Sequence, residues 1–137
     1  MVANKNKYIL DTNICISLLK NKYGIREKVL DVKAENCFVS EITIAELYYG
    51  ASKSNNKEER IKDVSYIASI FQVIPVYESL ELYGDIKAEL ERGGTPLDDF
   101  DILIGSSAIY RNFIMVTDNV KHLNKLPGIR IQNWVKR

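Results

Sequence analysis

The sequence predicts an α/β protein: a single domain, residues 1–137, built on a central, mainly parallel sheet of four to five strands. Two observations support this fold class. Short apolar runs without polar alternation recur along the chain, as is typical of strands buried on both faces. Segments with helical periodicity separate these runs, and strands that alternate with helices form parallel sheets with helices on both faces. A chain of 137 residues is also long enough to bury a substantial core in one domain.

The predicted elements follow one another in a regular order. Predicted strands cover residues 8–10, 37–39, 73–74, 114–117 and 129–131. Predicted helices cover residues 14–20, 25–34, 41–51, 64–71, 77–92 and 102–109. Local signals mark several ends: Thr12 and Asn13 are suitable N-caps for the first helix, Ser40 is one for the third, and Gly93 ends the fifth. A polar, mostly basic stretch, residues 53–62, is predicted as a solvated loop and the start of the fourth helix, which continues over residues 64–71.

The composition limits the classes of protein that fit. The formal net charge is +1, so any binding to nucleic acid must depend on local patches. No apolar run approaches the roughly 18 residues of a membrane span, and no signal-peptide core precedes the first strand. Cys15 and Cys37 stand in separate apolar segments, which favours buried thiols over a disulfide. We therefore expect a cytoplasmic protein that does not associate with membranes.

Acidic residues stand where strands end and helices begin. Asp11 directly follows the first strand, at the edge where open parallel sheets build their sites. An alternative explanation is that Asp11 merely caps the next helix. Glu46 lies about one and a half turns into the helix after the second strand. It shares a stripe with Ile42 and Thr43, so we expect it to border the buried face.

Further acids follow later in the chain. Asp98 and Asp99 are explained by capping and by the helix macrodipole. Asp101 differs, because it opens a helix rich in small residues that allow close packing. Its carboxylate is therefore expected to point into a shared cleft. The pair Asp118 and Asn119 follows the fourth strand, so polar groups are predicted to converge at the same edge of the sheet.

Carboxylates that gather at one edge need a counter-charge. Two of them about 5 Å apart repel by roughly 3 kcal/mol at an effective dielectric constant of about 20. The single histidine, His122, cannot support a histidine-rich zinc site, whereas all-oxygen ligands suit Mg²⁺ or Mn²⁺. A divalent ion polarises a phosphoryl oxygen and lowers the pKa of water. These residues therefore predict metal-assisted hydrolysis of phosphodiester bonds.

Taken in order, these motifs resemble the PIN-domain ribonucleases, and in particular the VapC toxins of toxin–antitoxin pairs. The resemblance covers nearly the whole chain, and although each motif is weak alone, the set in this order is specific. It rests on Tyr8-Ile9-Leu10-Asp11-Thr12-Asn13, Ile42-Thr43 with Glu46-Leu47, Asp101 before Ile102-Leu103-Ile104, Val116-Thr117-Asp118-Asn119, and the ending from Pro127-Gly128 to Trp134.

The resemblance implies a three-layer α/β/α sandwich and a metal-dependent endoribonuclease that uses Mg²⁺, with Mn²⁺ as a possible substitute. It implies that Asp11, Glu46 and Asp101 are the metal-binding catalytic acids. Thr12 and Asn13 match the small polar residues that support the site in this family.

The resemblance leaves the fourth catalytic position open. The family position falls on Asn119, whereas the acid of this chain is Asp118, so both are candidates. The resemblance further implies an RNA substrate such as a tRNA, a small cognate antitoxin, and assembly as a homodimer or a toxin–antitoxin hetero-oligomer. In the family, the helix after the second strand borders the antitoxin groove, which makes Tyr48 and Tyr49 candidate antitoxin contacts.

Three other classes of protein were weighed against this interpretation. A phosphatase of the haloacid dehalogenase type needs a second Asp two residues after the first, where this chain has Asn13. A receiver domain needs a Lys after its last strand, and Lys125 follows no such strand end. A catalytically inactive PIN-fold binding module stays open, and a metal-dependent cleavage assay would separate it from a nuclease.

Overall fold

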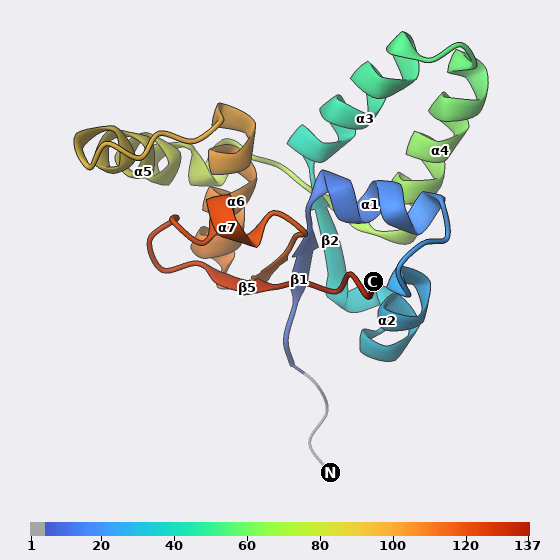
Figure 1. The fold of residues 1–137 in the computed structure, drawn as a ribbon, viewed down its shortest axis with the longest axis horizontal. Helices are drawn as coiled ribbons and strands as arrows, with labels where there is room; N and C mark the ends of the chain where they lie inside the picture. The colour runs from blue at the N-terminus through green and yellow to red at the C-terminus, as the bar shows by residue number, and fades with distance from the viewer. Residues whose placement is uncertain (1–4) are drawn as a thin grey trace.

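The computed structural model describes residues 5–137 and confirms the α/β fold class (Figure 1). The strands are β1 (Tyr8–Leu10), β2 (Cys37–Ser40), β3 (Gln72–Ile74), β4 (Ile114–Val116) and β5 (Arg130–Gln132). The α-helices are α1 (Thr12–Leu19), α2 (Ile25–Val32), α3 (Glu41–Lys53), α4 (Lys57–Ile70), α5 (Leu80–Arg92), α6 (Asp99–Arg111) and α7 (Val120–Leu123). Two short 3₁₀ turns are η1 (Ala34–Asn36) and η2 (Tyr77–Ser79).

The five strands form one sheet in the order β3-β2-β1-β4-β5, and every neighbouring pair is parallel. Strand β1 is therefore central. Leu10, its last residue, lies opposite Val116 of β4. Because all strands run the same way, their carboxyl ends share one edge of the sheet. The residues that follow β1, β2 and β4 are brought together there.

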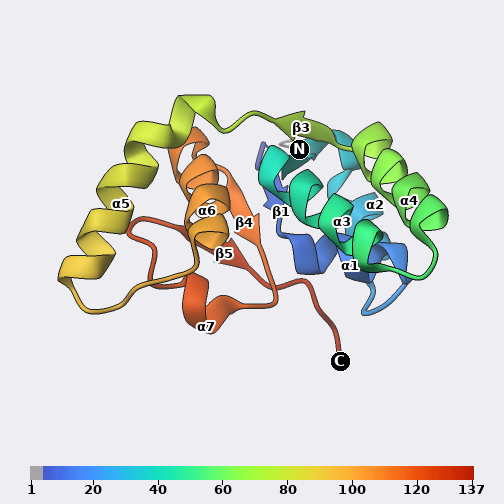
Figure 2. The same ribbon diagram turned by 90° about the horizontal axis from the view of Figure 1, so that it is seen from above.

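Strand residues alternate between two hydrophobic layers, as the pleat of a buried sheet requires. Tyr8 and Leu10 face the layer that contains apolar side chains of α1, α2, α3 and α4. Ile9 and Met115 face the opposite layer, which is built with α5, α6 and α7. Figure 2 shows these two groups of helices on either side of the strands. The predicted three-layer α/β/α sandwich is confirmed.

Two helices, α1 and α6, begin earlier than predicted, and α6 starts at Asp99 rather than at residue 102. Helix α1 starts at Thr12 because Asp11, rather than Thr12 or Asn13, is its N-cap. Helix α4 starts at Lys57, inside the polar stretch that was predicted to contain its start. Glu58 and Glu59 lie in its first turn, where the helix macrodipole favours acids. The earlier starts of α1 and α6 fall at residues whose polar side chains suit a helix start.

Close packing of α6 follows from its small residues. A Cβ atom on Gly105 would lie 2.2 Å from Cδ1 of Leu126, so a side chain at this position requires Leu126 to move. Ser106, Ser107 and Ala108 are fully buried. The helix can therefore approach the sheet closely, which fixes the position of its first turn at the carboxyl edge.

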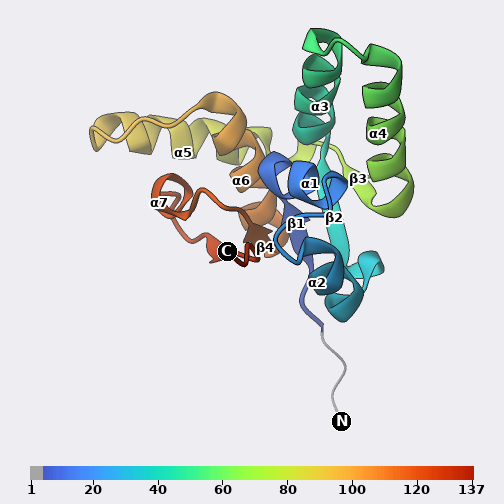
Figure 3. The same ribbon diagram turned by 45° about the vertical axis from the view of Figure 1, so that its right-hand side comes forward.

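Other features of the fold concern the cysteines and the chain end. Cys15 and Cys37 are buried free thiols, as predicted. Trp134 packs edge-on against Tyr8, with ring centroids 5.2 Å apart. Helices α3 and α4 lie side by side and extend beyond the sheet (Figure 3). None of the helices within residues 5–137 has the length and apolar character of a membrane span.

Candidate active site

Three acidic residues that are far apart in the sequence approach one another at the carboxyl edge of the sheet. Asp11 follows β1, Glu46 lies in α3, and Asp101 lies in the first turn of α6. Their charges are coupled, because both Asp11 and Glu46 act electrostatically on Asp101. The structure therefore brings these predicted site residues into one region, and their role as metal ligands stays a prediction.

Asp11 is held in place by three hydrogen bonds. Its Oδ1 accepts from the backbone N–H of Thr12 at 2.9 Å, while Oδ2 accepts from Thr117 Oγ1 at 2.8 Å and from Asn13 Nδ2 at 3.3 Å. Only 4% of Asp11 is exposed, and this burial raises its pKa above the ordinary value, although the three hydrogen bonds oppose the rise. Asp11 therefore caps α1 and also contributes charge to the acidic edge, as we call the part of the carboxyl edge where Asp11, Glu46 and Asp101 approach one another.

Glu46 is tied to α1 through a threonine hydroxyl. Thr12 Oγ1 donates to Glu46 Oε1 at 2.6 Å and also lies 3.1 Å from the hydroxyl of buried Thr43. Burial raises the pKa of Glu46, and the charges of Asp11 and Asp98 raise it further, whereas the hydrogen bond from Thr12 lowers it. The predicted supporting residue Thr12 thus orients the Glu46 carboxylate.

Asp101 is the acid most strongly affected by its surroundings. Partial burial, together with the charges of Asp11, Asp98 and Glu46, raises its pKa from 3.8 to about 6. The first turn of α6 therefore carries a carboxylate at the meeting point of three other acids. This arrangement favours a cation at the edge.

The two candidates for the fourth catalytic position have other partners. The Asp118 carboxylate accepts from Arg137 Nη2 at 2.7 Å and from Asn133 Nδ2 at 3.1 Å, and these bonds hold its pKa below the ordinary value. Asn119 Oδ1 lies 2.7 Å from Nδ1 of His122. In the described part of the chain, neither side chain hydrogen-bonds to the three converging acids.

Two residues of this region, Thr117 and Asp98, were not predicted as members of the site. Thr117 bonds directly to Asp11 and also accepts from the backbone N–H of Asn119 at 3.0 Å. Asp98 is the N-cap residue of α6, as predicted, but its side chain makes no capping hydrogen bond, and its charge adds to the negative charge of the edge. A threonine at the end of an apolar run, beside the strand of Asp11, is the signal that could have identified Thr117.

The donor set suits a divalent cation by its chemistry. All converging donors are oxygens, which Mg²⁺ and Mn²⁺ prefer. The pKa values of Glu46 and Asp101 are raised mainly by burial and further by the neighbouring acids, so a bound cation would favour their charged forms. Within residues 5–137, no three His, Cys, Asp or Glu side chains form a ready-made metal-binding group. The acids therefore fit a cation by type and charge rather than as a preformed cage.

Comparison with known proteins defines the class of this fold and site. The family model described as PIN domain matches residues 8–127, so the chain belongs to the PIN-domain family. Among curated proteins, it is 38% identical over 130 residues to the tRNA(fMet)-specific endonuclease VapC of Salmonella typhimurium, covering 93% of this chain and 98% of that protein. It is 34% identical over 132 residues to the ribonuclease VapC2 of Rickettsia felis, covering 94% and 98%.

Solved structures give the same result. DNA-bound VapBC from Salmonella typhimurium matches with a TM-score of 0.87 and 35% identity, over 94% of this chain and 98% of that chain. VapBC2 from Rickettsia felis, bound to a promoter DNA fragment, matches with a TM-score of 0.84 and 33% identity, over 93% and 98%. Within its family the chain is thus similar over nearly its whole length to the VapC ribonucleases, which favours a nuclease over an inactive binding module.

Proposed function

We propose that this chain is the ribonuclease toxin of a toxin–antitoxin pair and that it hydrolyses RNA at the acidic edge with Mg²⁺, for which Mn²⁺ can substitute. The observation that carries the proposal is the approach of Asp11, Glu46 and Asp101 from three separate elements. Full-length similarity to VapC ribonucleases supports it. The cytoplasm, where RNA and a cognate antitoxin are available, is the proposed location.

In this proposal Asp11, Glu46 and Asp101 hold the ion, which when bound supplies a Lewis acid for a phosphoryl oxygen and lowers the pKa of water. The other residues orient these carboxylates. The hydroxyl of Thr117 fixes one oxygen of Asp11, and the hydroxyl of Thr12 fixes one oxygen of Glu46. Such hydrogen bonds limit the reorganisation needed as charge develops on the phosphate.

A tRNA is the proposed substrate. The support is the name of one relative, the tRNA(fMet)-specific endonuclease VapC, to which the chain is 38% identical. The test incubates purified protein with total RNA and with isolated tRNA, in Mg²⁺, in Mn²⁺ and in excess EDTA. We expect discrete tRNA fragments only when a divalent ion is present. RNA that stays intact under all conditions would support the inactive binding module instead.

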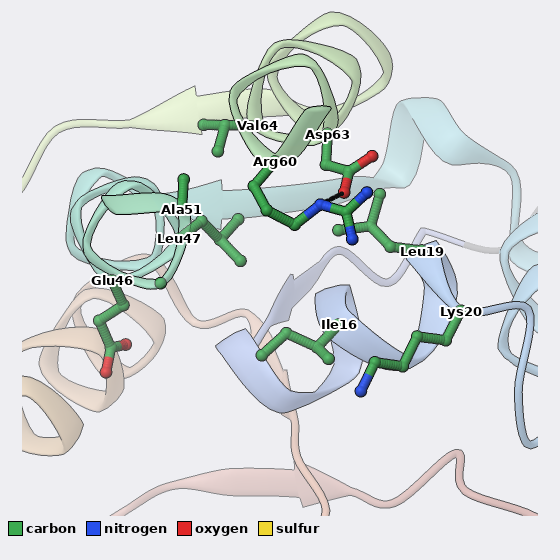
Figure 4. A pocket seen from close by; sticks show the side chains of 10 residues that line it. Ile16, Leu19, Lys20, Glu46, Leu47, Ala51, Arg60, Asp63 and Val64 are labelled. Atoms are coloured by element: carbon green, nitrogen blue, oxygen red, sulfur yellow. Dashed lines mark ion pairs between the residues drawn. The ribbon is translucent and has the colours of Figure 1, made fainter. Parts of the chain in front are cut away.

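A groove beside Glu46 is the proposed site for the antitoxin. It has a volume of about 300 Å³ and lies between α1, α3 and α4 (Figure 4). Apolar side chains dominate its wall, and Arg60, paired with Asp63 at 3.0 Å, lies along it. Glu46 also lines the groove, so a peptide bound there would lie against the acidic edge. The solved VapBC structures support a partner of this kind.

The groove changes which residues are tested for antitoxin binding. Tyr48 and Tyr49 are 47% and 65% exposed, but neither lines the groove. Ile16 lines it and is 39% exposed, so a substitution there alters the groove without emptying the core. We expect Ile16→Glu to weaken antitoxin binding at least about tenfold in a calorimetric titration, since it replaces an apolar contact with a carboxylate that a bound peptide would have to desolvate.

Leu30→Glu is the matched control for this test, because Leu30 is 79% exposed on α2 and does not line the groove. Equal affinities of the two variants would remove the groove from the interface. Light scattering of the toxin alone and with antitoxin would then distinguish a homodimer from a toxin–antitoxin hetero-oligomer.

A further inference from the structure

A second charged cavity lies at the opposite, amino-terminal edge of the sheet. It has a volume of about 340 Å³ and is lined by three short segments from distant parts of the chain. Its four charged lining residues are all cationic: Lys5, Lys7, Arg111 and Arg130. None of the 18 Asp and Glu residues of the chain lines it. A near-neutral protein thus concentrates positive charge in one hollow, which we call the basic cavity.

The fold holds the backbone of this cavity in place. The carbonyl of Lys7 accepts a hydrogen bond from the N–H of Ile114 at 2.9 Å, so the segment before β1 is fixed to β4. Arg130 lies opposite Ile114 in the sheet, and its guanidinium donates to the carbonyl of Asn112. Asn112 itself ends α6 in the left-handed conformation, with φ at 58°. The cations are therefore presented by a rigid sheet edge.

Little in the described part of the chain neutralises these charges. Within residues 5–137, Lys5, Lys7 and Arg130 form no ion pair with a carboxylate. The Lys7 ammonium lies 5.8 Å and 5.9 Å from two phenylalanine ring centroids, and these rings attract the cation but supply no negative charge. Arg111 pairs with Glu78 through Nη2 at 3.4 Å, while its buried Nη1 has no hydrogen-bond partner in this region. Buried charged donors without partners are costly, so an added acceptor would stabilise this edge.

We propose that the basic cavity binds phosphate groups of the RNA backbone, away from the site of cleavage. Protein–nucleic acid interfaces are polar and strongly positive, whereas the cores of protein–protein interfaces are depleted in lysine. Among residues 5–137, six of the seven that line the cavity have charged or amide side chains, and the seventh is the apolar Phe113. The proposal rests on RNA being the substrate, and it adds a second contact surface about 13 Å along β1 from Asp11, at 3.3 Å per residue.

The test measures binding of a short RNA hairpin to the full chain in EDTA, where cleavage does not occur. We compare the parent with the double variant Lys5→Gln/Lys7→Gln and with the control Lys22→Gln/Lys57→Gln. Both control lysines are exposed and form no ion pair within residues 5–137. We expect the first double variant to lose about tenfold in affinity at 0.1 M salt. Its slope of log K against log salt should be shallower by between about one and two.

Two further measurements identify the bound group. Amide resonances of Lys7, Asn112 and Arg130 should shift on addition of the hairpin in nitrogen-15 spectra, and inorganic phosphate should shift the same resonances more weakly. Resonances that respond to phosphate but not to the hairpin would overturn the proposal in favour of a small-anion site. A changed oligomeric state of Lys5→Gln/Lys7→Gln, with unchanged RNA affinity, would overturn it in favour of a protein contact.

Failure of this inference can be told apart from failure of the proposed function. Metal-dependent cleavage by the parent protein, with equal RNA affinity of the two double variants, would refute the basic cavity and leave the nuclease intact. Hairpin binding at the cavity without any cleavage in Mg²⁺ or Mn²⁺ would refute the nuclease and leave the basic cavity intact. Absence of both would refute both.

Discussion

Two neighbouring strands of the sheet end in similar sequences, yet their acids have opposite surroundings. Leu10-Asp11-Thr12-Asn13 follows β1, and Val116-Thr117-Asp118-Asn119 follows β4. Asp11 is buried with a raised pKa, whereas Asp118 is paired with Arg137 and its pKa is lowered. The register explains the difference. Leu10 lies opposite Val116, so the residue beside Asp11 is Thr117. The side chain of Asp118, one position further on, points away from Asp11.

The largest expected effect is the difference in RNA cleavage between a substitution at Asp11 and the same substitution at Asp118. Asp11→Asn keeps the shape of the side chain and removes its charge, so we expect RNA cleavage to fall about 1,000-fold or more. Asp118→Asn removes a carboxylate that already has protein partners, and cleavage should fall less than about threefold, as for most surface substitutions. Initial cleavage rates of the two variants, with circular dichroism as a control for folding, decide the matter. Equal losses would mean that Asp118 leaves Arg137 and acts in the site.

The second largest effect is expected at Thr117, which lies beside Asp11 where β1 and β4 end. Thr117→Val removes the hydroxyl that donates to Asp11 at 2.8 Å while keeping the side-chain shape. Loss of a group that orients a metal ligand typically costs about 10- to 100-fold in metal affinity or activity, and we expect a loss in that range. Titration with Mn²⁺ measures the affinity. Thr117→Ser restores the hydroxyl and should recover most of the binding, and a variant as weak as Thr117→Val would point to a packing defect instead.

The smallest expected effect is on stability and depends on pH. The pKa of Asp101 is about 6 in the folded protein, against 3.8 for the unperturbed group. Below pH 3.8 both states carry the proton, and above it the unfolded chain loses the proton first. Stability of the metal-free protein therefore falls as pH rises through about 6. Asp101→Asn removes this dependence and should raise the melting temperature at pH 7 by several degrees, for roughly 1–3 kcal/mol of relieved repulsion.

Melting curves of parent and Asp101→Asn, in EDTA and in Mn²⁺ at pH 4 and pH 7, provide the measurement. Mn²⁺ should stabilise the parent more than the variant, because a ligand bound only by the folded state raises stability. If Asp101 served only the macrodipole of α6, the variant would be less stable by about 0.3–1 kcal/mol. The two explanations therefore differ in sign.

The sequence was sufficient for the fold and for the approach of the three acids, because both depend on local patterns. Apolar runs marked the strands, and the strand ends located Asp11, while helical periodicity placed Glu46 at the border of the core. The hydrogen bond from Thr117 could not be predicted, since it depends on the register between β1 and β4. A shift of one residue would exchange the positions of Thr117 and Asp118.

Contacts between distant segments also could not be predicted from the sequence. Arg137 reaches Asp118 across a segment that contains α7 and β5, and no local sequence pattern links the two residues. The basic cavity combines Lys7 with Arg111 and Arg130, which a net charge of +1 conceals. Composition reports the total charge of a molecule, whereas binding depends on where the fold places it.

The central position of β1 has a consequence for how the protein is made. A ribosome releases Asp11 early, but the strand that supplies Thr117 lies 106 residues later in the chain. Until β4 has emerged, β1 lacks one of its two neighbours in the sheet and Asp11 lacks its buried hydrogen bond. The acidic edge is therefore completed only after β4 and Thr117 have emerged. On the proposed function, a nascent chain cannot cleave the RNAs of the ribosome that makes it before the sheet is assembled, when the proposed antitoxin groove is also formed.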